Sequence, residues 1–154
     1  MMLRKSISAL VLASFVLGAL AGPVLAGHRI QDNKEGTVSL ESVGHVDDVP
    51  EQASGVARFK LDPLPEGDSR MTVTLTVNNL PERAGRVYEV WLTNGSGTSL
   101  NLTAFNTNTN GDAKTTVSRH IVNIAPYDRI VVTRKRRASF NTSRGQTILS
   151  GRLH

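Results

Sequence analysis

The stretch from residue 70 to residue 80 reads Arg70-Met-Thr-Val-Thr-Leu-Thr-Val-Asn-Asn-Leu80. Apolar side chains alternate here with threonines, and a period of two residues places the apolar set on one face of a β-strand. The stretch is also rich in β-branched residues, which suit a pleated, half-buried surface. It predicts a strand with one face in a hydrophobic core and the other lined by hydroxyl groups.

Similar patterns recur along the chain after residue 36. Seven further strands are predicted, over residues 37–43, 55–62, 87–93, 100–105, 113–119, 128–134 and 146–153. The 87–93 strand is apolar on both faces except for Glu89, which predicts a central place in the sheet. Short strands with turn residues about every 8–12 positions are typical of antiparallel sandwiches. We therefore expect an all-β fold: an antiparallel β-sandwich of Ig-like or Greek-key type with about eight strands.

A polar loop precedes the predicted strand over residues 113–119. Asn110-Gly111 predicts a type I′ hairpin, because both central residues of that turn need positive φ. The preceding asparagines imitate the spacing of a calcium loop, but its first three ligand positions are neutral and its twelfth residue is Val117 rather than glutamate. We expect no calcium site, and no metal, cofactor or catalytic residue is singled out elsewhere.

The first 26 residues resemble a secretory signal peptide. Arg4 and Lys5 form a short positive region, residues 7–22 are apolar or small, and residues 23–26 read Pro-Val-Leu-Ala before a predicted mature start at Gly27. An uncleaved anchor over residues 6–26 is the alternative. We expect a secreted or periplasmic protein with no stable membrane span after cleavage.

Composition narrows the possible functions. Without the predicted signal peptide, 128 residues remain, and their 16 basic and 13 acidic side chains give a net charge of +3. This charge is too low for a dedicated nucleic-acid binder, so we expect no specific nucleic-acid partner. There is no cysteine, which excludes disulfides and thiol chemistry. Residues 27–154 are predicted to form one domain, with an N-terminal arm and first strand over 27–54 and the main sandwich over 55–154.

A family resemblance begins at Tyr88-Glu-Val-Trp91-Leu92. The Gly-rich loop 94–98, Ala104-Phe105, the loop closed by Gly111-Asp112-Ala113, residues 127–133 and the terminal Ile148-Leu-Ser-Gly151 continue it. In these features the chain resembles the extracytoplasmic domain of RskA-type anti-sigma factors. The resemblance implies a β-sandwich outside the membrane that senses the envelope or binds a protein. A weaker resemblance to secreted CHRD-type domains rests on shorter motifs.

The chain departs from the anti-sigma pattern in two respects. We expect no N-terminal zinc-binding helical domain to hold a sigma factor, because no such segment is recognised in the 154 residues. It also carries a basic run where relatives usually place an acidic residue and a proline. Sigma-factor inhibition is therefore not carried over, and the resemblance implies only the fold and a binding role.

The dense basic run Arg134-Lys135-Arg136-Arg137 is the first candidate contact surface. We expect it at a hairpin tip or strand end, with Arg129, Arg144 and Arg152 nearby, where it would engage an anionic partner. A solvated turn is the alternative interpretation. The second candidate surface comprises Trp91 and the exposed loop Asn94-Gly95-Ser96-Gly97.

We therefore expect a non-catalytic binding module whose partner is a protein or an anionic envelope polymer. One alternative is an adhesion or structural module that binds anionic polymers through the basic loop. Another is a small envelope hydrolase, which requires a pocket that joins His120 or His45 to an acid and a hydroxyl.

Overall fold

The computed structural model describes residues 34–44, 46–82, 85–136 and 144–153. The predicted signal peptide, His45 and Arg137 lie outside these residues. In the described part of the chain, no helix has both the length and the apolar character needed to cross a membrane.

The described residues are almost entirely strand and turn. The strands are β1 (Glu35–Ser42), β2 (Ser54–Pro63), β3 (Ser69–Asn78), β4 (Arg86–Thr93), β5 (Ser99–Phe105), β6 (Ala113–Ile121), β7 (Arg129–Arg136) and β8 (Gln146–Arg152). A short 3-10 turn at Pro65–Gly67 lies between β2 and β3. The prediction of an antiparallel all-β fold with about eight strands is confirmed.

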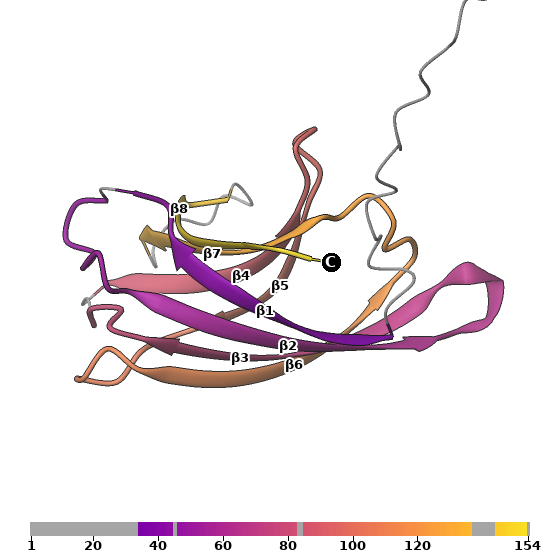
Figure 1. The fold of residues 1–154 in the computed structure, drawn as a ribbon, viewed down its shortest axis with the longest axis horizontal. Coiled ribbons are helices and arrows are strands. Elements are labelled where there is room, and N and C mark those ends of the chain that lie inside the picture. The colour runs from indigo at the N-terminus through magenta and orange to yellow at the C-terminus, as the bar shows by residue number, and fades with distance from the viewer. Residues whose placement is uncertain (1–33, 45, 83–84, 137–143, 154) are drawn as a thin grey trace, which may run out of the picture.

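All eight strands are hydrogen-bonded into one sheet, in the order β5-β4-β7-β8-β1-β2-β3-β6. Every pairing in it is antiparallel. The sheet curls over, so that β4, β7 and β8 form an upper layer and β2, β3 and β6 a lower layer in Figure 1. Its edge strands β5 and β6 approach each other and nearly close the structure. The sandwich is thus a single continuous sheet folded on itself.

The core fills the space between the two layers. Met71, Val73, Leu75 and Val77 of β3 are almost completely buried, whereas the threonines between them face outward. Alternation therefore acts in β3 as the sequence predicts. Strand β4 lies between β5 and β7, and its residues from Tyr88 to Thr93 are all buried, as expected for a central strand.

The predicted hairpin at Asn110-Gly111 is wrong. Strand β6 pairs with β3 rather than with β5, and of the two central residues only Gly111 has positive φ, at 83°. The Asn108 side-chain oxygen accepts hydrogen bonds from the backbone N–H groups of Asn110 and Asp112, at 3.0 and 2.9 Å. This local bonding builds a wider loop that carries the chain from one edge of the sheet to the other.

Candidate functional site

A β-bulge in β8 shapes the outer face of the upper layer. The register of β8 against β7 shifts between Val132 and Thr133, and Ile148 is the residue that it skips. Ile148 and the next residue, Leu149, are both buried in the core. Because a bulge redirects the side chains around it, Thr147 is left on the outer face.

A groove of about 410 Å³ lies over this outer face. Val131, Thr147 and Ser150 line it from β7 and β8, and Val131 lies directly opposite Ser150 in the register. Arg129 and Arg144 also line the groove. Hydroxyl groups and guanidinium groups therefore border the same space, which can hydrogen-bond an anion from two sides.

The turn after β4 forms another part of the groove wall through Asn94 and Gly95. The Asn94 side-chain oxygen accepts hydrogen bonds from the backbone N–H groups of Ser96 and Thr98, at 3.0 and 2.9 Å. The backbone N–H of Asn94 donates to the carbonyl of Thr98, 3.2 Å away, and Gly97 supplies the positive φ of 89°. The predicted loop is thus exposed, as expected, and its shape is fixed by internal hydrogen bonds.

The groove is basic. Arg129 lies opposite Arg152 in the β7–β8 register, so two guanidinium side chains start from neighbouring positions on one face. The contact of Arg129 Nε with Asp128 Oδ1 is long, at 3.9 Å, and this Nε is buried without a hydrogen-bond partner. The Arg129 side chain is 39% exposed, and Arg144 is exposed. Both arginines can therefore reach a ligand in the groove.

The structure separates the three described residues of the basic run, Arg134, Lys135 and Arg136. Arg134 points into the layer interface beside Tyr88, is 5% exposed, and donates from Nη2 to the carbonyl of Asp47 at 3.0 Å. Lys135 lies on the outer face but is mostly buried. Only Arg136 is exposed, and Arg137 lies outside the described residues. Among the described residues of the run, Arg134 and Lys135 therefore do not belong to an exposed basic surface, because β7 extends through Arg136 and its alternation turns Arg134 inward.

Trp91 is not a surface residue either. It is 7% exposed on the outer side of β4, and its indole N–H donates to the Thr133 hydroxyl at 3.1 Å. Glu89, on the same side of β4, pairs with Lys135 through Oε1 and Nζ, 2.7 Å apart. Trp91 is therefore held against Thr133 of β7 and does not line the groove.

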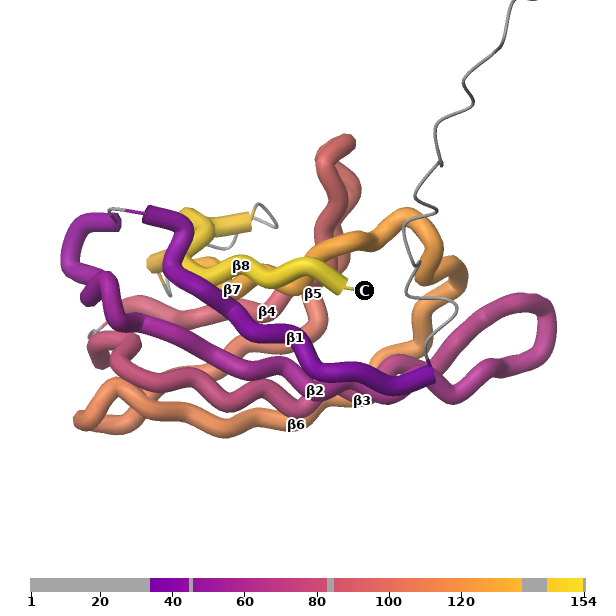
Figure 2. Tube along the Cα trace, viewed as in Figure 1, coloured from indigo at the N-terminus to yellow at the C-terminus, as the bar shows by residue number. Residues whose placement is uncertain are grey.

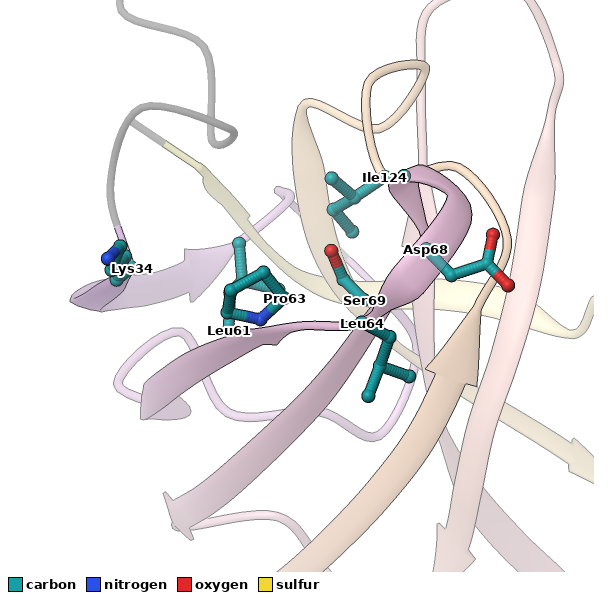
Figure 3. A pocket seen from close by; sticks show the side chains of 8 residues that line it. Lys34, Leu61, Pro63, Leu64, Asp68, Ser69 and Ile124 are labelled. Carbon is teal, nitrogen blue, oxygen red and sulfur yellow. The ribbon is translucent and has the colours of Figure 1, made fainter.

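A second pocket, of about 240 Å³, lies at one end of the folded sheet. Figure 3 shows Leu61, Pro63 and Ile124 around it, with Lys34 at one side and Asp68 turned away from the centre. Its lining is mainly apolar, and no residue of the predicted contact surfaces belongs to it. The sequence indicated no function for this end of the molecule.

The same end holds the acid that a hydrolase would need near His120. His120 Nε2 lies 2.6 Å from Asp68 Oδ2, and Ser69 lines the pocket. In the β3–β6 register, however, His120 pairs with Arg70 while Ser69 pairs with the buried Ile121. Opposite residues of an antiparallel pair share a face, so Ser69 and His120 project from opposite faces of the sheet. This arrangement does not bring the pocket hydroxyl to the imidazole.

The structure thus unites only part of what the sequence indicated. Arg129, Arg144 and Asn94 meet at the groove, whereas Arg134 and Trp91 are buried. Thr147 and Ser150 carried no signal, because they are ordinary strand residues until the bulge places both on the outer face. In the described ranges, no three histidine, aspartate or glutamate side chains gather into a metal site.

Comparison of the chain with models of known families, with curated proteins and with solved structures found no match.

Proposed function

We propose that the domain is a non-catalytic recognition module that works outside the cytoplasm and binds an anionic envelope polymer in the groove between Arg129 and Arg144. The observation that carries the proposal is the juxtaposition of these two arginines with Thr147, Ser150 and the turn that begins at Asn94. The ligand groups that suit this chemistry are phosphate, carboxylate or sulfate.

The chemistry of the groove supports an anionic ligand in three ways. Guanidinium groups form charge-assisted hydrogen bonds with anionic oxygens. The hydroxyl groups of Thr147 and Ser150, which line the groove, add neutral hydrogen-bond donors. The long contact between Arg129 and Asp128 leaves the charge of Arg129 only weakly compensated within the protein.

The shape of the groove supports a polymer rather than a small metabolite. It lies on the outer surface of the sheet instead of between the layers, since its lining residue Val131 is not part of the core. Ligand pockets that enclose small molecules usually bury most of the ligand surface in an apolar cavity. An open, polar surface groove is better suited to successive charged groups of a chain.

The sequence supports the location and the recognition role. The predicted signal peptide directs the chain out of the cytoplasm. The resemblance to RskA-type extracytoplasmic domains supports a recognition role on a β-sandwich. Under this proposal an envelope-sensing role would depend on the same groove, because ligand binding there is the event that is sensed.

The test is binding of the purified domain to inorganic polyphosphate and to polygalacturonate, which separate phosphate from carboxylate recognition. The double variant Arg129→Ser/Arg144→Ser should bind at least about tenfold more weakly, since each charge-assisted hydrogen bond contributes about 1.5–3 kcal/mol. Binding by the unchanged domain should also weaken steeply with salt.

The matched control is Arg70→Ser/Arg86→Ser, which removes the same charge from positions outside the groove. It should retain most of the affinity. Equal losses in both double variants, or binding that does not respond to salt, would refute the groove as the binding site. A partner protein bound equally well at low and high salt would favour the protein-binding alternative instead.

A further inference from the structure

A second basic surface lies on the outer face of the lower layer. The outward residues of β3 and β6 form rows of hydroxyl groups across the strand pair. Thr72 and Ser118 hydroxyls lie 2.7 Å apart, and Thr74 and Thr116 hydroxyls lie 3.0 Å apart. These hydrogen bonds hold the side chains in fixed positions and make an ordered polar floor.

Two cations flank part of this floor. A depression of about 330 Å³ is lined by Arg58 of β2, by Lys114 of β6 and by Thr74 and Thr76 of the strand between them. Arg58 lies opposite Thr74, and Lys114 lies opposite Thr76. Neighbouring strands are about 4.8 Å apart and two residues span about 6.8 Å along a strand, so the two cationic residues start from backbones roughly 12 Å apart. That distance leaves room for anionic groups over the threonine hydroxyls.

The charges of Arg58 and Lys114 are available to a ligand. Both residues are exposed, and neither forms an ion pair with an acid of the described residues. Lys60, the next outward residue of β2, differs because its Nζ lies 2.8 Å from Asp62 Oδ1. The hydrogen bond and charge of Asp62 raise the pKa of Lys60 above its usual value of 10.5, so Lys60 is protonated but already paired.

This surface and the Arg129–Arg144 groove lie on opposite sides of the molecule. Figure 2 shows β7 and β8 above the core and β3 and β6 below it, and each site is on the side of its layer that faces away from the core. A single polymer segment in the groove therefore does not cover the threonine surface. Charge complementarity makes a second polyanion segment the occupant that fits the threonine surface.

We infer that the surface between Arg58 and Lys114 is a second polyanion site, and that one domain bridges two segments of the anionic polymer. The bridging part rests on the proposed function of the groove. The second site itself does not, because its cations and hydroxyls belong to other strands. A protein with two such sites would cross-link polymer chains rather than merely coat them.

The first measurement is the stoichiometry of a short probe, inorganic tripolyphosphate, by calorimetry. The unchanged domain should bind two molecules per chain. Arg58→Ser/Lys114→Ser and Arg129→Ser/Arg144→Ser should each bind one. Circular dichroism checks that both variants keep the strand content of the parent.

The second measurement is light scattering during titration with long-chain polyphosphate. Bridging predicts a scattering maximum at an intermediate ratio, since excess polymer saturates each site separately. Either double variant should lose at least about nine-tenths of this maximum. Lys34→Ser/Arg86→Ser, which removes two positive charges from positions that line neither site, should keep it.

The outcomes separate the two proposals. One bound probe per chain, unchanged by Arg58→Ser/Lys114→Ser, would overturn the second site and leave the groove proposal standing. One bound probe that is lost only in Arg58→Ser/Lys114→Ser would refute the groove and the bridging while keeping the threonine surface. Two bound probes without a scattering maximum would overturn bridging alone.

Discussion

Arg119 of β6 donates a hydrogen bond from Nε to the carbonyl oxygen of Leu102 on β5, 2.8 Å away. Strands β5 and β6 are the two edges of the sheet, and every other strand is already hydrogen-bonded to a neighbour on each side. The register of β5 with β4 shifts at Val90 and skips Leu102, which leaves this residue outside the regular ladder. The hydrogen bond therefore connects the two edge strands at a bulge, where the Leu102 carbonyl is free to accept it.

Replacing Arg119 with Ala should weaken the contact between the edge strands β5 and β6. The free energy of unfolding should fall by about 1 kcal/mol, the usual contribution of one hydrogen bond. Amide exchange in β5 should accelerate more than exchange in the central strands. Urea denaturation and hydrogen exchange measure the two effects. Arg70→Ala, at an exposed position of β3, is the control and should change stability by less than about 0.5 kcal/mol. Equal stability of both variants would contradict the role of Arg119.

Gly97 and Gly111 allow a matched comparison of two loops. Each is the fourth residue of a five-residue loop whose first residue is an asparagine that caps the loop, and their φ angles are 89° and 83°. A Cβ at Gly97 would meet nothing, whereas one at Gly111 would lie 2.9 Å from the Leu80 carbonyl oxygen.

Gly97→Ala should therefore cost about 1 kcal/mol of stability from backbone strain alone. Gly111→Ala should cost at least about 1 kcal/mol more, because the added methyl group collides with backbone atoms. Thermal and urea unfolding of the two variants give the difference. Equal losses would show that the 108–112 loop can move away from Leu80.

Glu89 and Lys135 form a buried ion pair, with side chains 7% and 18% exposed. Glu89 Oε2 has no hydrogen-bond partner, so the carboxylate depends on Lys135 for compensation. Lys135→Met should lower the free energy of unfolding by about 3 kcal/mol, because it leaves a buried charge unpaired. The double variant Glu89→Leu/Lys135→Met should recover most of this loss. Urea midpoints test both statements, and a double variant less stable than Lys135→Met would contradict them.

Trp91 is the only tryptophan of the chain, which makes its fluorescence specific. Thr133→Val removes the acceptor of the buried indole N–H and should cost about 1–2 kcal/mol. Thr133→Ser keeps a hydroxyl at the same place and should cost less. The emission maximum should shift in Thr133→Val and stay near the parent value in Thr133→Ser. An unchanged spectrum and urea midpoint in Thr133→Val would show that this hydrogen bond does not contribute to stability.

Alternation made most strands predictable. In β2 and β3 the buried residues are the apolar alternate positions, because each strand has one face on the core and one in solvent. The same rule, carried into the basic run, would have turned Arg134 inward with Val132. The sequence interpretation ended the strand at Arg134, the first residue of this run, and treated all four cations as one exposed surface.

The candidate groove could be predicted only in part. Arg129 and Arg144 were expected near a basic surface because of their charge. Thr147 and Ser150 were not, because three positions separate them and strict alternation places such residues on opposite faces. The bulge at Ile148 reverses that relation. A bulge depends on the partner strand, so the local pattern does not reveal it.

The amino-acid sequence by itself determined which segments are strands and which side chains face the core, because burial follows a local period of two residues. Only the tertiary structure decided that the strands form one folded sheet with β5 beside β6, and which cations share a surface. These features arise from pairings between residues far apart in the chain, such as Arg119 with Leu102. No local pattern carries the register of such pairings.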